Sequence, residues 1–298
     1  MKTIYNIGSI NIDHVYSVDH FVSPGETLSA NNYEIFPGGK GFNQSVALAK
    51  AGARVVHGGN IGKEGEWLVT FLNEAGVNTS CIKISDIATG HAIIQVDSTG
   101  ENAIFLFGGA NQSIESQQIT DMLRDSEEGD YLLLQNEINN VGVIIEEAKR
   151  QKLEIVFNPA PMDENVHRLP LNLVDWLIVN ETEGAGLTGE KDQQKIVSGL
   201  LERFSTSKII LTLGSRGVIY ADAQNQIELP AFKVDAVDTT ATGDTFIGYL
   251  LASISAGIGI EESLKKACAA AALSASRKGA ASSVPDVSEV EQFLNERA

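Results

Sequence analysis

Short apolar runs alternate with helical stretches along this chain, and the alternation is most regular after residue 130. Strands are predicted there at residues 131–134, 154–158, 176–180 and 208–213, with helices at 141–151 and 194–204. Strands that alternate with helices connect as right-handed βαβ units, which give a mainly parallel sheet covered on both faces. The pattern therefore predicts an α/β fold.

The earlier part of the chain predicts a second, smaller sheet. An apolar strand at 3–8 ends at a glycine, but the strands at 13–18, 31–36, 91–96 and 102–107 have the pattern of half-exposed strands. The last two flank a hairpin turn. The other predicted elements are a strand at 54–59, helices at 42–51 and 64–75, an antiparallel edge hairpin at 217–221 and 226–230, and closing helices at 244–256, 261–277 and 288–297.

Composition narrows the choice of partners. The chain has 298 residues, 43% of them hydrophobic, and its 22 basic and 39 acidic residues give a net charge of −17. That charge argues against nucleic acid but allows a small anionic ligand at a local positive site. The cysteines Cys81 and Cys268 have neither metal-ligand nor disulfide spacing. Because residues 1–8 resemble a strand and no apolar run is long enough for a bilayer, we expect a cytoplasmic protein without a membrane partner.

Small residues at 239–243 lead directly into an apolar helix that contains Asp244. A helix start leaves backbone N–H groups unpaired, and the helix dipole adds partial positive charge, so such a turn binds anions and most often phosphate. A carboxylate in this turn provides a base for an attacking hydroxyl, as phosphoryl transfer requires. The alternative is that Asp244 is an ordinary helix N-terminal residue.

Polar residues follow several predicted strands at the point where each strand ends. These segments are 8–13, 135–137, 180–183 and 212–217. Because ligands of an open α/β sheet bind beyond the carboxyl ends of its strands, we expect the segments to line one polar cleft.

The glycine-rich loop at 37–43 does not match the common phosphate-loop motif, which needs wider glycine spacing and a hydroxyl after the lysine. The first strand is also not followed by the glycine fingerprint of dinucleotide-binding proteins, which argues against a nicotinamide oxidoreductase. The loop predicts a close backbone approach to a polar ligand, with Lys40 and Asn43 as donors. The alternative is a plain glycine turn.

Two segments resemble the two signatures of the PfkB carbohydrate kinase family. They are Gly-Gly-Lys-Gly-x-Asn at 38–43 and Asp-Thr-x-x-x-Gly-Asp at 238–244. Asn-Glu-Thr-Glu at 180–183 lies between them in the family's order, and matching stretches cover essentially the whole chain. Within the family the chain is most similar to the ribokinases.

The resemblance implies a single kinase domain over residues 1–298. Its fold would be a ribokinase-like three-layer α/β sandwich, with a mainly parallel central sheet and a small β-sheet lid from about 12–36 and 90–108. The implied activity is transfer of the ATP γ-phosphate to a sugar hydroxyl, with D-ribose as the first candidate and ribose 5-phosphate as its product. The lid would also form a homodimer.

The resemblance assigns a role to each matching residue. Asp244 would be the catalytic base and would contact the sugar, with Asn11, Asp13, Gly39, Lys40, Asn43 and Glu137. ATP would contact Asn180, Thr212, Gly214, Ser215, Arg216, Gly217, Gly243 and Cys268. Glu183 would help to hold Mg²⁺ through water. K⁺ would be bound by the side chains of Asp238 and Ser283 and by the carbonyls of Thr240, Ser274, Arg277 and Gly279, which are all oxygen ligands. The alternative is that Asp238 only caps its turn.

Three residues depart from the family's pattern. Thr242 brings a β-branched side chain to the phosphate turn, Phe42 stands where ribokinases usually carry a small residue, and Cys268 replaces a histidine that often lies near the adenine. Other acceptors stay open, namely deoxyribose, a ketohexose or a nucleoside, whose base could stack on the lid aromatics Tyr16, Phe21, Tyr33 and Phe36. A non-catalytic sugar-binding protein on this fold is expected to lack Lys40, Gly243 or Asp244, and all three are present.

Overall fold

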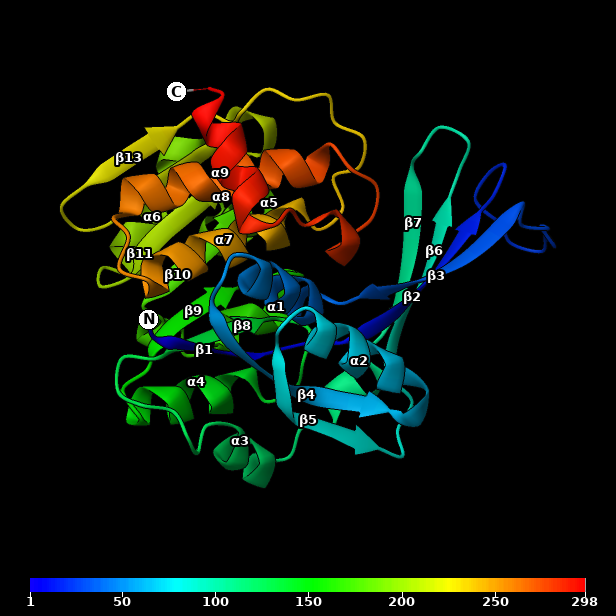
Figure 1. Ribbon diagram of the computed structural model, residues 1–298, viewed down its shortest axis with the longest axis horizontal. Coiled ribbons are helices and arrows are strands. Elements are labelled where there is room, and N and C mark those ends of the chain that lie inside the picture. The colour runs from blue at the N-terminus through cyan, green and yellow to red at the C-terminus, as the bar shows by residue number, and fades with distance from the viewer. Residues whose placement is uncertain (298) are drawn as a thin grey trace.

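The computed structural model describes residues 1–297, and Ala298 lies outside them. The strands of the main sheet are β1 (Thr3–Ile7), β4 (Arg54–Gly62), β5 (Asn78–Ser85), β8 (Tyr131–Gln135), β9 (Glu154–Asn158), β10 (Trp176–Asn180), β11 (Lys208–Thr212), β12 (Val218–Ala221) and β13 (Gln226–Leu229). A separate sheet contains β2 (Asn11–Ser17), β3 (Asn32–Gly38), β6 (Gly90–Val96) and β7 (Asn102–Phe107). Figure 1 shows this small sheet standing at one side of the main body.

The main sheet is parallel except at one edge. Its strand order is β13-β12-β11-β10-β9-β8-β1-β4-β5. The strands from β11 to β5 in this order pair in parallel, and β12 and β13 add an antiparallel edge. The small sheet has the order β3-β2-β6-β7. The α/β fold, the edge hairpin and the second sheet are therefore confirmed.

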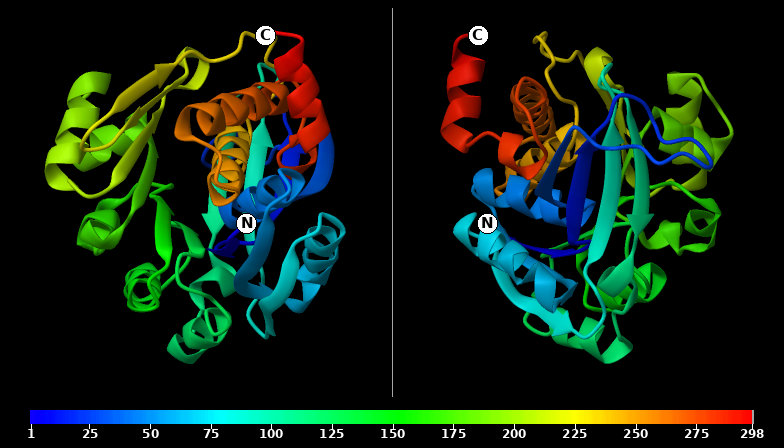
Figure 2. Two further views of the ribbon diagram at one scale, coloured as in Figure 1. Left: turned by 60° about the vertical axis from the view of Figure 1, so that its left-hand side comes forward. Right: turned by 90° about the vertical axis from the view of Figure 1, so that its right-hand side faces the viewer.

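Helices cover both faces of the main sheet, so the fold has three layers (Figure 2). One layer holds α1 (Lys40–Lys50), α2 (Glu66–Glu74), α7 (Thr242–Ser255), α8 (Ile260–Ala275) and α9 (Val287–Asn295). The other holds α3 (Ser116–Met122), α4 (Val141–Arg150), α5 (Glu181–Thr188) and α6 (Gln193–Arg203). Side chains alternate between the two faces of the sheet, so each strand contributes to a hydrophobic core on either side. In β8, Leu133 packs in the core under the first helical layer, and Leu132 and Leu134 pack in the core under the second. In residues 1–297, no helix is long and apolar enough to cross a membrane.

Three elements were not predicted from the sequence, and each has a weak local pattern. The edge strand β5 has the polar sequence Asn-Thr-Ser-Cys-Ile-Lys-Ile-Ser and contains no buried residue. Helix α3 has seven residues, and α5 contains two glycines, which disfavour a helix. The helix predicted at 64–75 begins with a 3₁₀ turn at Lys63–Gly65, and the helix predicted at 42–51 begins two residues earlier, at Lys40.

Both faces of the small sheet carry exposed apolar side chains, but Asp13 lies on only one of them. Strand pairing places His14 opposite Ile35 and Ile93, and Ile93 opposite Phe105, so these residues share one face. Exposed side chains on that face are Tyr33, Ile35, Ile93, Phe105 and Phe107, and Phe105 is 65% exposed. The adjacent row points to the opposite face because side chains alternate along a strand, and it contains Asp13 together with the exposed Phe36, Ile104 and Leu106.

Candidate active site

Polar residues gather at the carboxyl-terminal edge of the main sheet. The segments after β1 and β8 meet there with the first turns of α1 and α7. The small sheet begins at the same edge, because β2 starts at Asn11, four residues after β1 ends (Figure 1). This arrangement brings residues from distant parts of the sequence into one group.

Glu137 ties the glycine loop to the end of β8. Its Oε2 accepts hydrogen bonds from the backbone N–H of Lys40, at 3.0 Å, and from Ser9 Oγ. Gly39 has a φ of 92°, and a Cβ there would lie 2.9 Å from the carbonyl oxygen of Ser9. The loop can approach the first strand this closely because the residue is glycine.

Asp13 and Asn11 project from the face of the small sheet opposite the one that carries Phe105. Burial and the nearby Glu137 carboxylate raise the pKa of Asp13 to about 7. A Cβ on Gly38 would lie 2.1 Å from Asp13 Oδ2, so this glycine leaves room for the carboxylate. Asn11 is 3% exposed, and its Oδ1 accepts a 2.7 Å hydrogen bond from Asn111 Nδ2.

Lys40 lies among acidic side chains. Burial alone would lower its pKa, but the carboxylates of Asp244, Glu137 and Glu183 together raise it. The ammonium group is therefore held in its charged form at the centre of the acidic group. A positive charge here offsets the repulsion between carboxylates and an anionic ligand.

Asp244 is the third residue of α7 and is 8% exposed. Its Oδ1 accepts a 2.8 Å hydrogen bond from Gln44 Nε2, and its Oδ2 accepts a longer one, at 3.3 Å, from Asn43 Nδ2. Burial raises the pKa of Asp244, and Lys40, Gln44 and Asn43 oppose that shift. One oxygen is thus firmly held, and the other keeps capacity to accept a proton or a hydrogen bond.

Besides Gln135 Oε1, which lies behind Asp244, two buried polar atoms at this edge have no hydrogen-bond partner within residues 1–297. They are Asn43 Oδ1 and Thr242 Oγ1. Leaving such atoms unpaired costs roughly 1–3 kcal/mol each. Thr242 precedes Gly243, at which a Cβ would meet open space. Both atoms therefore suit hydrogen bonds to a ligand.

The residues predicted to contact a nucleotide follow β10 and β11. Asn180 and Glu183 form a capping box at the start of α5, in which Glu183 N donates to Asn180 Oδ1 and Asn180 N donates to Glu183 Oε2, each at 2.9 Å. Thr212 is paired with Asn180 in the sheet, which places the two strand ends side by side.

The turn after Thr212 is shaped by two glycines. Gly214 has a φ of 58° and Gly217 a φ of 115°, and a Cβ on Gly217 would lie 2.0 Å from the carbonyl oxygen of Leu229. Ser215 is exposed, and Arg216 forms an ion pair with Glu181. In residues 1–297, no hydrogen bond joins Cys268 to this turn; Cys268 lies on α8 in the core, where burial raises the pKa of its thiol to about 12.

The residues predicted to hold K⁺ join the turn before α7 to the segment after α8. Asp238 Oδ2 accepts from Gly279 N at 3.0 Å, and Oδ1 accepts from Thr240 N at 2.9 Å. The hydroxyls of Ser274 and Ser283 are 2.8 Å apart. Burial disfavours the charge on Asp238, but its hydrogen bonds outweigh burial and keep its pKa below the usual value. The donors predicted for K⁺ lie on segments in contact here.

The structure places Phe42 away from the ligand group. Its side chain is fully buried, and its ring centroid lies 5.5 Å from that of Phe71 in the core. The aromatic residue at this position therefore fills the space between α1 and α2. It does not narrow the sugar side of the loop.

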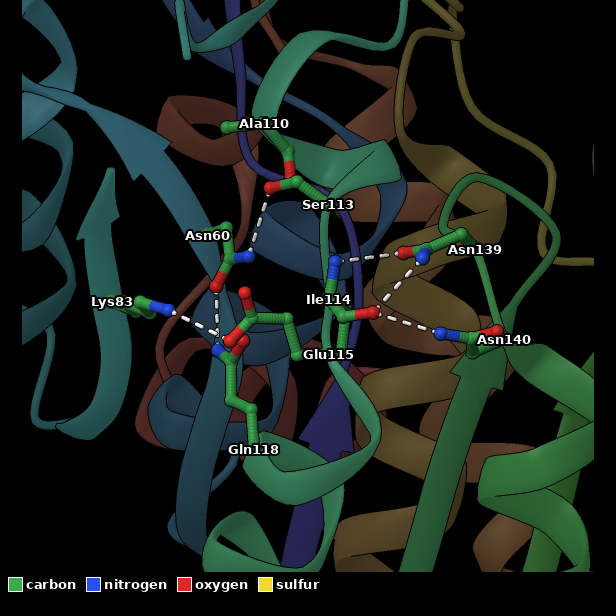
Figure 3. A network of polar contacts seen from close by, with 9 residues as sticks. All are labelled: Asn60, Lys83, Ala110, Ser113, Ile114, Glu115, Gln118, Asn139 and Asn140. Carbon is green, nitrogen blue, oxygen red and sulfur yellow. Dashed lines mark hydrogen bonds and ion pairs between the residues drawn. The ribbon is translucent and has the colours of Figure 1, made fainter. Parts of the chain in front are cut away.

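Some residues support the site from behind; Gln44 and Asn111 were not predicted from the sequence, and Gln135 was expected only as part of the segment that lines the cleft. Gln44 and Gln135 are fully buried behind Asp244, and Asn111 is bonded to Asn11. Figure 3 shows how the segment after Asn111 is fixed: the N–H and the carbonyl of Ile114 both bond to Asn139, each at 2.9 Å. A glutamine or asparagine in a sequence does not by itself indicate a supporting role. Only position could have indicated one, since Gln44 follows Asn43 and Gln135 ends β8.

Comparisons with known proteins agree across the whole chain. The sequence profile described as pfkB family carbohydrate kinase matches residues 1–287. A ribokinase of Haemophilus influenzae is 37% identical over 98% of this chain and 98% of that protein. A solved ribokinase of Thermotoga maritima is 37% identical with a TM-score of 0.90, covering 99% of this chain and 100% of the other. An Arabidopsis thaliana ribokinase solved with ribose and ATP is 27% identical with a TM-score of 0.89, covering 98% of each chain.

Proposed function

Since the chain belongs to the pfkB family of carbohydrate kinases, whose members transfer phosphate to a sugar hydroxyl, we propose that it phosphorylates D-ribose with ATP to give ribose 5-phosphate. The observation that carries this proposal is the setting of Asp244. A buried carboxylate lies in the first turn of α7, beside the Lys40 ammonium and the unpaired Asn43 oxygen. A base for a hydroxyl and a site for an anion are thus adjacent.

The sugar would bind between the small sheet and the glycine loop. Asn11, Asp13, Lys40, Asn43 and Glu137 offer both donors and acceptors, which suits sugar hydroxyls because each of them donates and accepts. The backbone of Gly39 would contact the ring closely. The small sheet would act as a lid, with the Asp13 face toward the sugar.

The hydroxyl that attacks would donate its proton to Asp244 Oδ2. The γ-phosphate would lie at the start of α7, where Gly243 N–H and the unpaired Thr242 hydroxyl are available and the helix dipole favours negative charge. The rest of ATP would extend past Asn180 and Thr212 along the turn of Gly214, Ser215, Arg216 and Gly217. Cys268 would border the adenine from α8.

Two cations fit the residues present. Glu183 is held by Asn180 and Asn158, whose Nδ2 donates at 3.3 Å, so it would bind Mg²⁺ through water. Mg²⁺ supplies positive charge to the transferred phosphate. Oxygen donors of Asp238, Thr240, Ser274, Arg277, Gly279 and Ser283 suit K⁺. That ion would steady the turn that carries Gly243.

The face of the small sheet that carries Phe105 suits a second copy of the chain. Isoleucine and aromatic side chains cluster there, and such patches on a protein surface mark interaction sites. We expect a cytoplasmic homodimer formed through this face, and a single kinase domain in each chain.

An assay of ADP release over a panel of sugars tests the proposed acceptor. Ribose should exceed 2-deoxyribose by roughly 10- to 100-fold in kcat/KM, because losing one hydroxyl leaves buried polar groups unpaired. Ketohexoses and nucleosides should be poorer still. A nucleoside phosphorylated faster than ribose would assign the enzyme to another acceptor.

A further inference from the structure

A chain of buried side-chain amides leads away from Asp244 into the core. Gln44 Nε2 donates to Asp244 Oδ1 at 2.8 Å, and Gln135 Nε2 donates to Gln44 Oε1 at 2.7 Å. Gln135 Nε2 also lies 3.0 Å from Asn6 Oδ1. Gln44, Gln135 and Asn6 are all fully buried, so water does not compete for these bonds.

The network joins four elements of the fold. Asp244 stands on α7, Gln44 on α1, Gln135 at the end of β8 and Asn6 on β1. Asn6 Nδ2 in turn donates to the Gly41 carbonyl and to Ser45 Oγ, each at 2.8 Å. The orientation of each amide is fixed by its neighbour, because a flipped amide would put two donors or two acceptors together.

We propose that Gln44 is a positioning residue for the base, and that Gln135 acts by holding Gln44. Gln44 occupies one oxygen of the Asp244 carboxylate, which leaves Oδ2, with its single long bond from Asn43, to take the proton of the acceptor. Small rotations of a catalytic carboxylate lower the rate, because proton transfer depends on alignment. The inference rests on the proposed role of Asp244 as base.

The charged groups around Asp244 determine how the loss of Gln44 should change the pH dependence of the rate. Lys40 from α1, Glu137 from the loop after β8 and Glu183 from α5 act on it. The bond from Gln44 is one of the interactions that keep the pKa of Asp244 from rising further. Its loss should therefore move the acidic limb of the rate profile to higher pH.

The test uses Gln44→Met, which keeps the length of the side chain and removes its donor. We expect kcat to fall about 10- to 100-fold, the rate equivalent of one hydrogen bond to a charged group, with KM for ribose and ATP changed by less than about threefold. The acidic limb should move to higher pH. Gln151→Met is the matched control. Gln151 is the C-cap of α4, away from the site, and its Nε2 also donates to a carboxylate, Glu147 Oε1, at 2.7 Å.

Gln135→Met should lower kcat in the same direction by a smaller factor. The double variant should be no slower than Gln44→Met alone, because Gln135 acts through Gln44. Additive losses would overturn the role of Gln135. If Gln44→Met does not fold, Gln135→Met is used in its place. Its kcat and pH profile are then compared with those of Gln151→Met.

Asp244→Asn separates this inference from the proposed function. If Asp244→Asn keeps full turnover, the assignment of the base is wrong. If Asp244→Asn is inactive but Gln44→Met has the turnover and pH profile of the parent, the base stands and the positioning role is wrong. A loss of thermal stability in Gln44→Met without a change in kcat or profile would likewise reduce Gln44 to a core residue.

Discussion

The Asp13 carboxyl group keeps its proton to an unusually high pH, because it is buried beside Glu137. Its folded pKa is about 7, against 3.8 for the free side chain. The folded state therefore binds this proton more tightly than the unfolded state does. The stability that this provides is present at low pH and is lost as the pH rises from about 4 to about 7.

Replacing Asp13 by Asn removes that pH dependence. We expect the free energy of unfolding of Asp13→Asn, relative to the parent, to improve by on the order of 2 kcal/mol as the pH rises from about 5.5 to about 7.5. Urea unfolding at several pH values measures it. A relative stability that stays flat or declines with pH would contradict the buried, protonated state of Asp13.

Residues that act through their own chemistry could be predicted from the sequence, whereas supporting residues could not. Lys40 and Asp244 stand in motifs whose residue types already suggest an anion and a base. Gln44 and Gln135 matter because of what they touch, and their 91-residue separation hides the contact. The side on which Phe42 lies depends on the start of α1, which the sequence placed two residues late.

At the scale of elements, the site depends on how closely α1 packs against α7. A Cβ on Gly248 of α7 would lie 2.4 Å from the Cβ of Ala47 on α1. The two helices could not keep their present separation with a larger residue there. Their first turns carry Lys40, Asn43 and Asp244, so the spacing of the helices sets the spacing of the proposed catalytic groups.

Gly248→Ala tests this coupling. We expect a lower melting temperature, because overpacking a core costs roughly 1–3 kcal/mol of stability. We also expect a several-fold fall in kcat. Gly142→Ala on α4 is the control, since its Cβ would make an ordinary contact of 3.4 Å with Pro170. Equal behaviour of the two variants would show that the contact between α1 and α7 does not position the site.

The turn before α7 is the second element whose position should affect the site. K⁺ bound between this turn and the segment after α8 should raise turnover several-fold over Na⁺ at equal ionic strength, and should raise the melting temperature. Asp238→Ala should abolish both differences, because it removes the one charged ligand. Equal rates and melting temperatures of the parent in K⁺, Na⁺ and a bulky organic cation would show that no such ion acts here.

The α/β architecture could be predicted from the sequence because the alternation of strands and helices is a local pattern that repeats along the chain. The mainly parallel sheet followed from that pattern, and the small sheet followed from the half-exposed pattern of its strands. The strand order of the main sheet was not predicted, and β5 was missed because an exposed edge strand has no apolar face to detect. Helix α5 was missed because its stability comes from the capping box of Asn180 and Glu183 and from packing, and not from helix-forming residues.

For the whole molecule, the proposed dimer and the proposed sugar site would use opposite faces of the small sheet, one carrying Phe105 and the other Asp13. Phe105→Glu places a charge on the first of these faces, at a side chain that is 65% exposed. We expect a monomer by light scattering, with the fold kept and ribose KM raised, because the lid would lose its support. A dimer that persists would place the interface elsewhere on the molecule.

Transfer of the ATP γ-phosphate to ribose, with Asp244 as the base, can be measured directly. Phosphorus NMR of the enzyme with ribose, ATP and Mg²⁺ follows the product directly. We expect ribose 5-phosphate and ADP in equal amounts, and a rate about 10²–10⁴-fold lower for Asp244→Asn with both ligands still bound. Inorganic phosphate instead of a sugar phosphate, or an Asp244→Asn rate within threefold of the parent, would contradict the account.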